Sequence, residues 1–330
     1  MNNSSVATLG EEDEEDFVYG FYSPMDVPLI LLGLLSIIIN STVLYLLFKK
    51  EYLRTPKNLF LGSLAVSDLF TASMNIPLFI GCSATLDTPL CVGASVLNHF
   101  ACLFDILQLL AITLDRLTAV LSPLTYPVIM STSRATNIIA FISVFSACAS
   151  FIQLLWLVSP GYDVSEVAMD TIEKYEMAYD IAVFVFFFIP VFVITYAIIH
   201  LFVIVRKHSR EISKRGSHRR TNHDDKSRWS HEMRSTVILA TMLVTYVLFW
   251  LLYLIVRVQM HFGNELFALP IAVENFIVFL RFSTCVSNPL LYTLRNHDFK
   301  VALKAERDSM NRRKEFKSST TKSTNSYDRP

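Results

Sequence analysis

Long apolar runs separated by short polar segments set the pattern of this chain. Seven runs have the length of a membrane-crossing helix, because a helix rises about 1.5 Å per residue and about 20 residues span the hydrocarbon core. The seven runs are Pro28–Phe48, Leu59–Phe79, Leu97–Val120, Asn137–Val158, Ile181–Val205, Ser235–Val256 and Phe267–Leu294. The pattern therefore predicts an all-α membrane protein, a seven-transmembrane helix bundle.

The composition supports this prediction. Hydrophobic residues make up 52% of the 330 residues and charged residues only 18%, and there are 25 phenylalanines. Because a soluble domain carries about 25% charged residues, the deficit comes from segments that do not meet water.

The charges are separated by sign, although they sum to zero. Acidic residues lie at Glu11–Asp16, Asp87, Asp163–Glu176 and Glu265. Basic residues lie in the alternate segments, at Lys49–Lys57, Arg134, Arg206–Arg234 and Lys300–Lys317. Since Lys and Arg concentrate on the cytoplasmic side, we expect the N-terminus outside and the C-terminus inside. Seven spans is the odd number that this orientation needs.

Four segments follow from this arrangement. Residues 1–25 form an extracellular acidic tail, and residues 26–295 form the bundle. Residues 296–308 alternate apolar and basic positions, which predicts a short amphipathic cytoplasmic eighth helix along the inner membrane surface. Residues 309–330 form a disordered cytoplasmic tail rich in Ser and Thr.

The N-terminal tail can be searched for two kinds of processing signal, a cleavable signal peptide and glycosylation sequons. It lacks a basic start and a short apolar core, so we expect no cleavable signal peptide. Asn2 and Asn3 each begin an N-x-S sequon on the expected outer side and are candidates for glycosylation. Asn40 also begins a sequon, but it lies in the middle of a span and should stay unmodified.

Five ionisable residues interrupt the apolar runs: Asp68, Asp105, Asp115, Arg116 and Arg281. A charge in a span costs at least about 2.5 to 3.5 kcal/mol on insertion scales. We therefore expect all five to face the interior of the bundle and to have partners there.

Polar and proline residues recur in the spans and loops in a distinctive order. They are Asn40, Asp68, Asp115, Arg116, Pro123, Tyr126, Pro190, Trp250, Asn288, Pro289 and Tyr292. This ordered set resembles the rhodopsin-like (class A) G-protein-coupled receptors over about residues 26 to 308. The resemblance implies a multi-pass receptor of the plasma membrane, not an enzyme, that binds an extracellular ligand in the bundle and activates a heterotrimeric G protein.

The resemblance also implies a switch at the inner end of the third span. Asp115 and Arg116 are adjacent and point in different directions on a helix, so Arg116 should be available to a second partner. Glu232 matches the acidic residue that pairs with this arginine in the resting state. Breaking the pair would let the sixth span swing outward and admit the G protein. Alternatively, Glu232 lies in a solvated charged loop.

The seventh span should contain a flexible joint. Pro289 removes a backbone donor, and we expect Asn288 to satisfy the freed carbonyl groups. The joint would lie beside Tyr292, which belongs to the same switch.

The cysteines depart from the family pattern. The usual bridge from Cys91 to the loop after the fourth span cannot form, because no cysteine lies between Cys148 and Cys285. Cys82 and Cys91 are the two cysteines at the outer, oxidising surface. They either bond to each other, which we favour, or remain free thiols.

The resemblance narrows the ligand class. The segment Phe267–Arg295 contains no lysine, which excludes a retinal Schiff base. Asn98 occupies the position of the aspartate that binds amines, so an ordinary biogenic amine is not expected, and a peptide or a small non-aminergic molecule is favoured. For His99 and Cys102, the alternative interpretation is that they are packing residues. The implied ligand set is Asn98, His99, Cys102, Trp250, Tyr253, Arg257, Glu274 and Arg281.

A charge cluster is expected in the bundle core. Asp68 matches the sodium-binding aspartate of the family, and Asp105 replaces a hydroxyl residue. Two carboxylates in one desolvated site cannot easily both ionise. Either Arg281 neutralises Asp105, which we favour, or Asp68 and Asp105 share a sodium ion or a proton.

Other classes and partners can be weighed on the sequence. A transporter is the alternative, but the chain shows no internal repeat. An intramembrane enzyme would need a nucleophile with a base or a metal motif, and neither is found. Expected partners are the ligand, the G protein, an arrestin at a phosphorylated tail, and membrane lipid, with no nucleic acid and no cofactor beyond the sodium ion.

Overall fold

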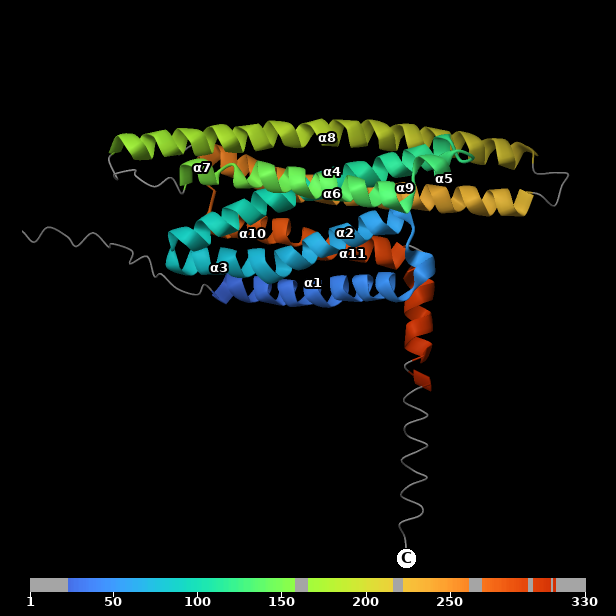
Figure 1. Cartoon of the computed structure of the whole chain (residues 1–330), viewed down its shortest axis with the longest axis horizontal. Helices are drawn as coiled ribbons and strands as arrows, with labels where there is room; N and C mark the ends of the chain where they lie inside the picture. The colour runs from blue at the N-terminus through green and yellow to red at the C-terminus, as the bar shows by residue number, and fades with distance from the viewer. Residues whose placement is uncertain are drawn as a thin grey trace, which may run out of the picture.

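The computed structural model describes residues 23–157, 166–215, 222–260, 269–295, 299–309 and 311–312. Its long helices run side by side along one axis and form a single bundle (Figure 1). The described elements are α1 (Ser23–Lys49), η1 (Glu51–Leu53), α2 (Pro56–Phe70), η2 (Thr71–Asn75), α3 (Ile76–Thr85), α4 (Thr88–Leu121), α5 (Tyr126–Ile129), α6 (Thr132–Phe151), α7 (Leu154–Leu157), α8 (Glu166–Arg215), α9 (Asn222–Met260), α10 (Ile271–Phe282) and α11 (Thr284–Arg295).

Six of the seven expected spans are continuous helical segments long and apolar enough to cross a membrane. They cover Pro24–Lys49, Pro56–Thr85, Thr88–Leu121, Thr132–Leu157, Thr171–Lys207 and Thr236–Gln259. The seventh expected run consists of two 12-residue helices, α10 and α11, that meet at Ser283. Together they complete the seven-transmembrane bundle, although neither is long enough alone.

The second span contains a local irregularity. Its helices α2 and α3 are joined through η2, a five-residue stretch of π-helix. Pro77 follows directly in the first turn of α3 and has no backbone N–H to donate. The wider turn accommodates the missing hydrogen bond and keeps the span continuous.

The buried side chains lie in the centre of the bundle, and exposed apolar side chains lie on its outside, as expected for a bundle that faces lipid. The core contains large apolar side chains from several helices, such as Phe60, Phe187, Tyr246 and Tyr292. By contrast, only 22% of the most apolar window of the fourth span is buried within the protein. Its outer face, with Phe141 for example, is apolar and exposed, which suits contact with lipid chains.

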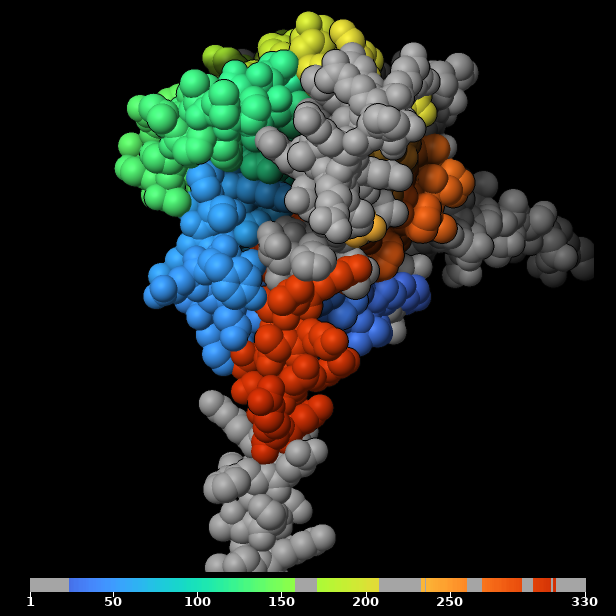
Figure 2. Space-filling model, turned by 90° about the vertical axis from the view of Figure 1, so that its right-hand side faces the viewer, coloured from blue at the N-terminus to red at the C-terminus, as the bar shows by residue number. Residues whose placement is uncertain are grey.

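The two ends of the bundle differ. At one end a disulfide joins Cys82 of α3 to Cys91 of α4, with 4.7 Å between the Cα atoms. We call this the disulfide end. The opposite end carries Arg116 near the end of α4 and the short helix α5, and we call it the Arg116 end. Figure 2 faces the Arg116 end.

A helix over residues 299–309, here called the C-terminal helix, leaves the Arg116 end crosswise to the bundle (Figures 1 and 2). Phe299 and Ala302 are buried against the core. Lys49 of α1 forms an ion pair with Glu306, and Lys50 adds a longer one at 3.6 Å. The expected eighth helix is therefore present, beginning three residues later than predicted within the described part of the chain.

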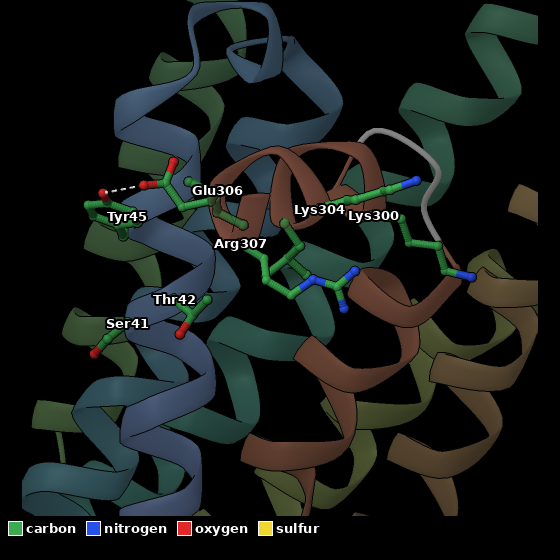
Figure 3. A pocket seen from close by; sticks show the side chains of 9 residues that line it. Ser41, Thr42, Tyr45, Lys300, Lys304, Glu306 and Arg307 are labelled. Carbon is green, nitrogen blue, oxygen red and sulfur yellow. Dashed lines mark hydrogen bonds between the residues drawn. The ribbon is translucent and has the colours of Figure 1, made fainter. Parts of the chain in front are cut away.

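A pocket of about 760 Å³ lies between α1 and the C-terminal helix (Figure 3). Its walls carry Ser41, Thr42 and Tyr45 from α1 and four charged side chains from the C-terminal helix. Tyr45 points at Glu306, and its hydroxyl donates a hydrogen bond of 3.2 Å to the carboxylate. This contact helps to fix the direction in which the C-terminal helix leaves the bundle.

Candidate functional site

A buried carboxylate near the disulfide end joins three helices. Asp180 of α8 is 3% exposed. Its Oδ1 lies 3.2 Å from His99 Nε2 of α4, and its Oδ2 accepts a hydrogen bond of 3.0 Å from Arg257 of α9. Charge-assisted bonds of this kind are stronger than neutral ones, so Asp180 fixes the relative positions of α4, α8 and α9.

The other side of His99 contacts the fourth span. His99 Nδ1 lies 3.0 Å from the backbone oxygen of Ser95 and 3.4 Å from Gln153 Nε2. The Ser95 hydroxyl donates to Gln153 Oε1 at 3.0 Å. Tyr179 packs edge-on against the imidazole, with 4.9 Å between the ring centres. His99 is therefore both a packing residue and the centre of a polar network.

An aromatic cluster lies deeper, between α9 and α10. Asn98 Nδ2 donates a hydrogen bond of 3.0 Å to the hydroxyl of Tyr253. Trp250 packs edge-on against Tyr253 at 6.0 Å. The guanidinium of Arg281 lies 4.6 Å from the centre of the Tyr253 ring and 3.7 Å from that of Phe282. The sequence-predicted residues Asn98, Trp250, Tyr253 and Arg281 thus come together.

The other predicted ligand residues differ in their burial and in their partners. Arg257 is 31% exposed and belongs to the Asp180 network, where it donates a hydrogen bond of 3.0 Å. Cys102 is buried in the hydrophobic core, so its thiol serves packing, and its backbone oxygen accepts a hydrogen bond of 2.6 Å from Tyr246. Glu274 is half-buried in the first turn of α10 and forms no ion pair with any described residue.

The expected pair between Asp105 and Arg281 is wrong. Both side chains are buried, yet within the described residues no ion pair joins them. Ser67 donates a hydrogen bond of 3.0 Å to Asp105 Oδ1 instead. The reason is that the faces of four aromatic rings hold the Arg281 guanidinium away from the carboxylate. These rings belong to Phe79, Trp250, Tyr253 and Phe282.

Asp68 and Asp105 do lie together in the core. They are 1% and 3% exposed, and the charge of Asp105 acts on Asp68. Asp68 Oδ2 is buried and has no hydrogen-bond partner among the described residues. Asn288 lies beside Asp68, but its Nδ2 meets no acceptor with hydrogen-bond geometry. The expectation that this amide satisfies carbonyl groups freed by Pro289 is therefore wrong.

The Arg116 end holds a compact ionic cluster. Arg116 Nε donates to Asp115 Oδ2 at 3.0 Å, and the Tyr126 hydroxyl donates to Asp115 Oδ1 at 2.7 Å. Asp115 and Arg116 pair although they are adjacent and point in different directions, because the long arginine side chain folds back along the helix. Tyr126 of α5 completes the cluster, since its hydroxyl also accepts from Arg116 at 3.3 Å.

The space beside Arg116 is nearly closed. A cavity of about 20 Å³ lies between Arg116, Ile238 and Leu239 of α9, and Tyr292 of α11. Tyr292 is buried, and its ring centre lies 6.0 Å from that of Phe299 in the C-terminal helix. The switch residues Arg116 and Tyr292 therefore line the same narrow gap between α4, α9 and α11.

Some predicted sites lie outside what the structure describes. Asn2, Asn3 and the tail after residue 312 are outside the described residues. Glu232 falls within α9, but its side chain is outside the described part. Its pairing with Arg116 stays a prediction.

Sequence reasoning missed two residues of the network, Asp180 and Gln153. Asp180 stands directly before the apolar run that starts at Ile181, where a charge reads as the boundary of a span. Gln153 lies inside the run Asn137–Val158, and a single amide in so apolar a helix was a usable signal.

Comparison with known proteins agrees with this arrangement. A family model described as 7 transmembrane receptor (rhodopsin family) matches residues 39–292. The chain therefore belongs to the rhodopsin family of seven-transmembrane receptors. As a member it is a multi-pass receptor of the plasma membrane, with an extracellular ligand and a G protein as partners.

Individual relatives are distant. The chain is similar to the histamine H2 receptor of Cavia porcellus, with 28% identity over 84% of this chain and 77% of the relative. It is also similar to the Gq-coupled rhodopsin of Mizuhopecten yessoensis, with 26% identity over 88% of this chain and 59% of the relative. Melanopsin-B of Xenopus laevis shares 27% identity over 87% of this chain and 54% of the relative.

Proposed function

We propose that the disulfide end of this receptor faces outward and takes a ligand, while the Arg116 end faces the cytoplasm and activates a heterotrimeric G protein. The N-terminus is then outside and the C-terminus inside. The distribution of basic residues supports this orientation, because Lys49, Lys50 and the basic C-terminal helix all lie at the Arg116 end.

The ligand is a peptide or a small molecule that is neither retinal nor an ordinary amine. The helices α10 and α11 contain no lysine that could hold retinal. Asn98 is an amide and donates to Tyr253, so it offers no charge to a ligand ammonium. The histamine receptor and the opsins therefore share the scaffold with this chain, while these two differences argue against the same ligands.

Activation proceeds by an outward movement of α9. The observation that carries this proposal is the narrow gap beside Arg116, where Ile238 and Leu239 of α9 lie against α4. A G-protein segment needs far more room than about 20 Å³. Moving α9 away would open the gap, and Arg116 could leave Asp115 to contact the G protein.

Three finer features belong to the same proposal. Glu232 holds α9 near Arg116 in the resting state. Asp68 and Asp105 hold a sodium ion or a proton, and the unpartnered Asp68 Oδ2 supports a small cation there. The basic C-terminal helix lies on membrane lipid, and the phosphorylated tail beyond residue 312 recruits arrestin.

Guanine-nucleotide exchange on a reconstituted G protein tests the proposed function. We expect the wild-type receptor to accelerate exchange and Arg116→Ala to abolish the acceleration, because the alanine cannot contact the G protein. Arg312→Ala is the control, because it removes an exposed arginine beyond the C-terminal helix, and it should keep exchange.

Surface expression of both variants must equal that of the wild type for the comparison to count. Exchange that persists in Arg116→Ala would contradict the proposed switch. Solute uptake by the wild-type protein without any effect on a G protein would instead favour a transporter.

A further inference from the structure

Arg281 is a buried cation without an anionic partner. It is 2% exposed, and its Nε makes no hydrogen bond. Across the ranges that the structure describes, its side chain forms no hydrogen bond and no ion pair with any other residue. Its neighbours are four aromatic rings, at 3.7 to 5.7 Å from the guanidinium carbon to the ring centres.

Ring faces alone compensate poorly for the desolvation of a guanidinium. A cation over an aromatic face is attracted weakly compared with a charge-assisted hydrogen bond to a carboxylate. Buried charges in spans normally pair with an opposite charge, and an intramembrane ionisable residue without such a pair indicates a functional site. Two buried acidic residues of the bundle are engaged elsewhere, since Asp105 accepts from Ser67 and Asp180 accepts from Arg257.

Other buried polar atoms near Arg281 are also without partners. They belong to Trp250, whose ring faces Arg281, and to Asn98, which is bonded to Tyr253 through its other amide atom. Trp250 Nε1 is an unused donor, and Asn98 Oδ1 is an unused acceptor. The cluster therefore offers one positive charge, one neutral donor and one acceptor, each more than nine-tenths buried.

From this geometry we infer that Arg281 is the counter-ion for a carboxylate on the receptor's ligand. The inference rests on the proposed function and deepens it by naming the chemical class of the ligand, an organic carboxylic acid. The ligand carboxylate accepts from the Arg281 guanidinium, and a donor on the ligand, such as a hydroxyl or an amide N–H, reaches Asn98 Oδ1.

The charge balance favours a carboxylate over a phosphate. A phosphate dianion would need two available cations in so desolvated a place. Arg257 is the second guanidinium near the cluster, and Asp180 already neutralises it through a hydrogen bond of 3.0 Å. A single carboxylate matches the one uncompensated charge.

Thermal unfolding of the purified receptor in lipid nanodiscs, without a G protein, tests the inference. The probes are three monocarboxylic acids at millimolar concentration, hexanoate, butyrate and phenylacetate, each beside its neutral amide. We expect a carboxylate to raise the melting temperature of the wild-type receptor by about 2 to 4 °C, because a ligand that binds only the folded state stabilises it. The corresponding amide should have no effect.

Three variants make the test specific. Arg281→Gln should lose the carboxylate-dependent shift, and it should melt higher than the wild type without any probe, because an uncompensated charge is removed. Arg281→Lys keeps the charge but not the two parallel donors, so it should need about tenfold more acid for the same shift. Arg312→Gln removes an exposed arginine far from the cluster and should respond as the wild type does.

Two results would overturn the inference. One is a wild-type melting temperature that no carboxylate changes or that acid and amide change equally. The other is a carboxylate shift that survives in Arg281→Gln. Because binding is measured without a G protein, either result can occur while nucleotide exchange by the wild type and its loss in Arg116→Ala still support the proposed function.

Discussion

Asp180 shows how one side chain can connect three helices near the disulfide end of this receptor. Its two oxygens are used by His99 of α4 and Arg257 of α9, and it is almost fully buried on α8. In such a place the loss of the carboxylate charge leaves the Arg257 guanidinium without compensation. The position therefore affects the stability of the bundle as well as the shape of the site.

We expect Asp180→Asn to lower the free energy of unfolding by about 3 kcal/mol, as found when one partner of a buried ion pair is removed. The measurement is the melting temperature of the purified receptor. Asp308→Asn is the matched control, because Asp308 is 44% exposed and lies 4.0 Å from its partner Arg307. Equal melting temperatures of the two variants would contradict the role of Asp180.

Single residues were predictable from the sequence when a regular helix alone places them. Trp250 and Tyr253 lie three residues apart on one apolar helix, and Asn98 faces them from α4 as expected. The partners of long side chains were not predictable. Arg116 folds back onto Asp115, and Arg281 turns to aromatic rings, because both choices depend on neighbours from other helices.

At the scale of elements, the apolar runs predicted the helices well and their interruptions less well. Six spans are continuous, but the break at Ser283 and the π-helical turn before Pro77 have no counterpart in the hydrophobic pattern. A break in the interior depends on which backbone groups neighbouring helices can satisfy, and periodicity carries no such information.

The docking of the C-terminal helix should depend on pH. The hydrogen bond from Lys49 holds the pKa of the Glu306 carboxyl below its ordinary value. A carboxyl with a lowered pKa stabilises the docked state above its ordinary pKa of about 4.3, and this contribution is lost as the pH falls through the lowered value. The docked helix should therefore loosen only in acid.

Spin labels at Ser41 and Arg312, in a Cys148→Ser background, measure this docking as a distance distribution. We expect a narrow distribution at pH 7 that broadens in acid, once the pH has fallen below the ordinary carboxyl pKa of about 4.3. Glu306→Gln removes the titrating group, so the distance distribution of this variant should be broad both at pH 7 and in acid. A distribution that stays narrow in acid would contradict the role of the Lys49–Glu306 pair.

At the scale of the whole molecule, the two ends are linked by continuous helices. The helix α9 carries Arg257, Tyr253 and Trp250 toward the disulfide end and Ile238 and Leu239 beside Arg116. A ligand that changes the contacts of the first three residues can therefore bias the position of the last two. This coupling requires α9 to have two discrete positions.

The distance between α6 and α9 at the Arg116 end tests this claim most directly. Ser133 and Arg234 are exposed on these helices, and spin labels at both positions, in the Cys148→Ser background, report their separation. We predict that a nucleotide-free G protein shifts the distribution toward longer distances. An unchanged distribution, while the same labelled receptor still accelerates nucleotide exchange, would contradict an activation mechanism based on movement of α9.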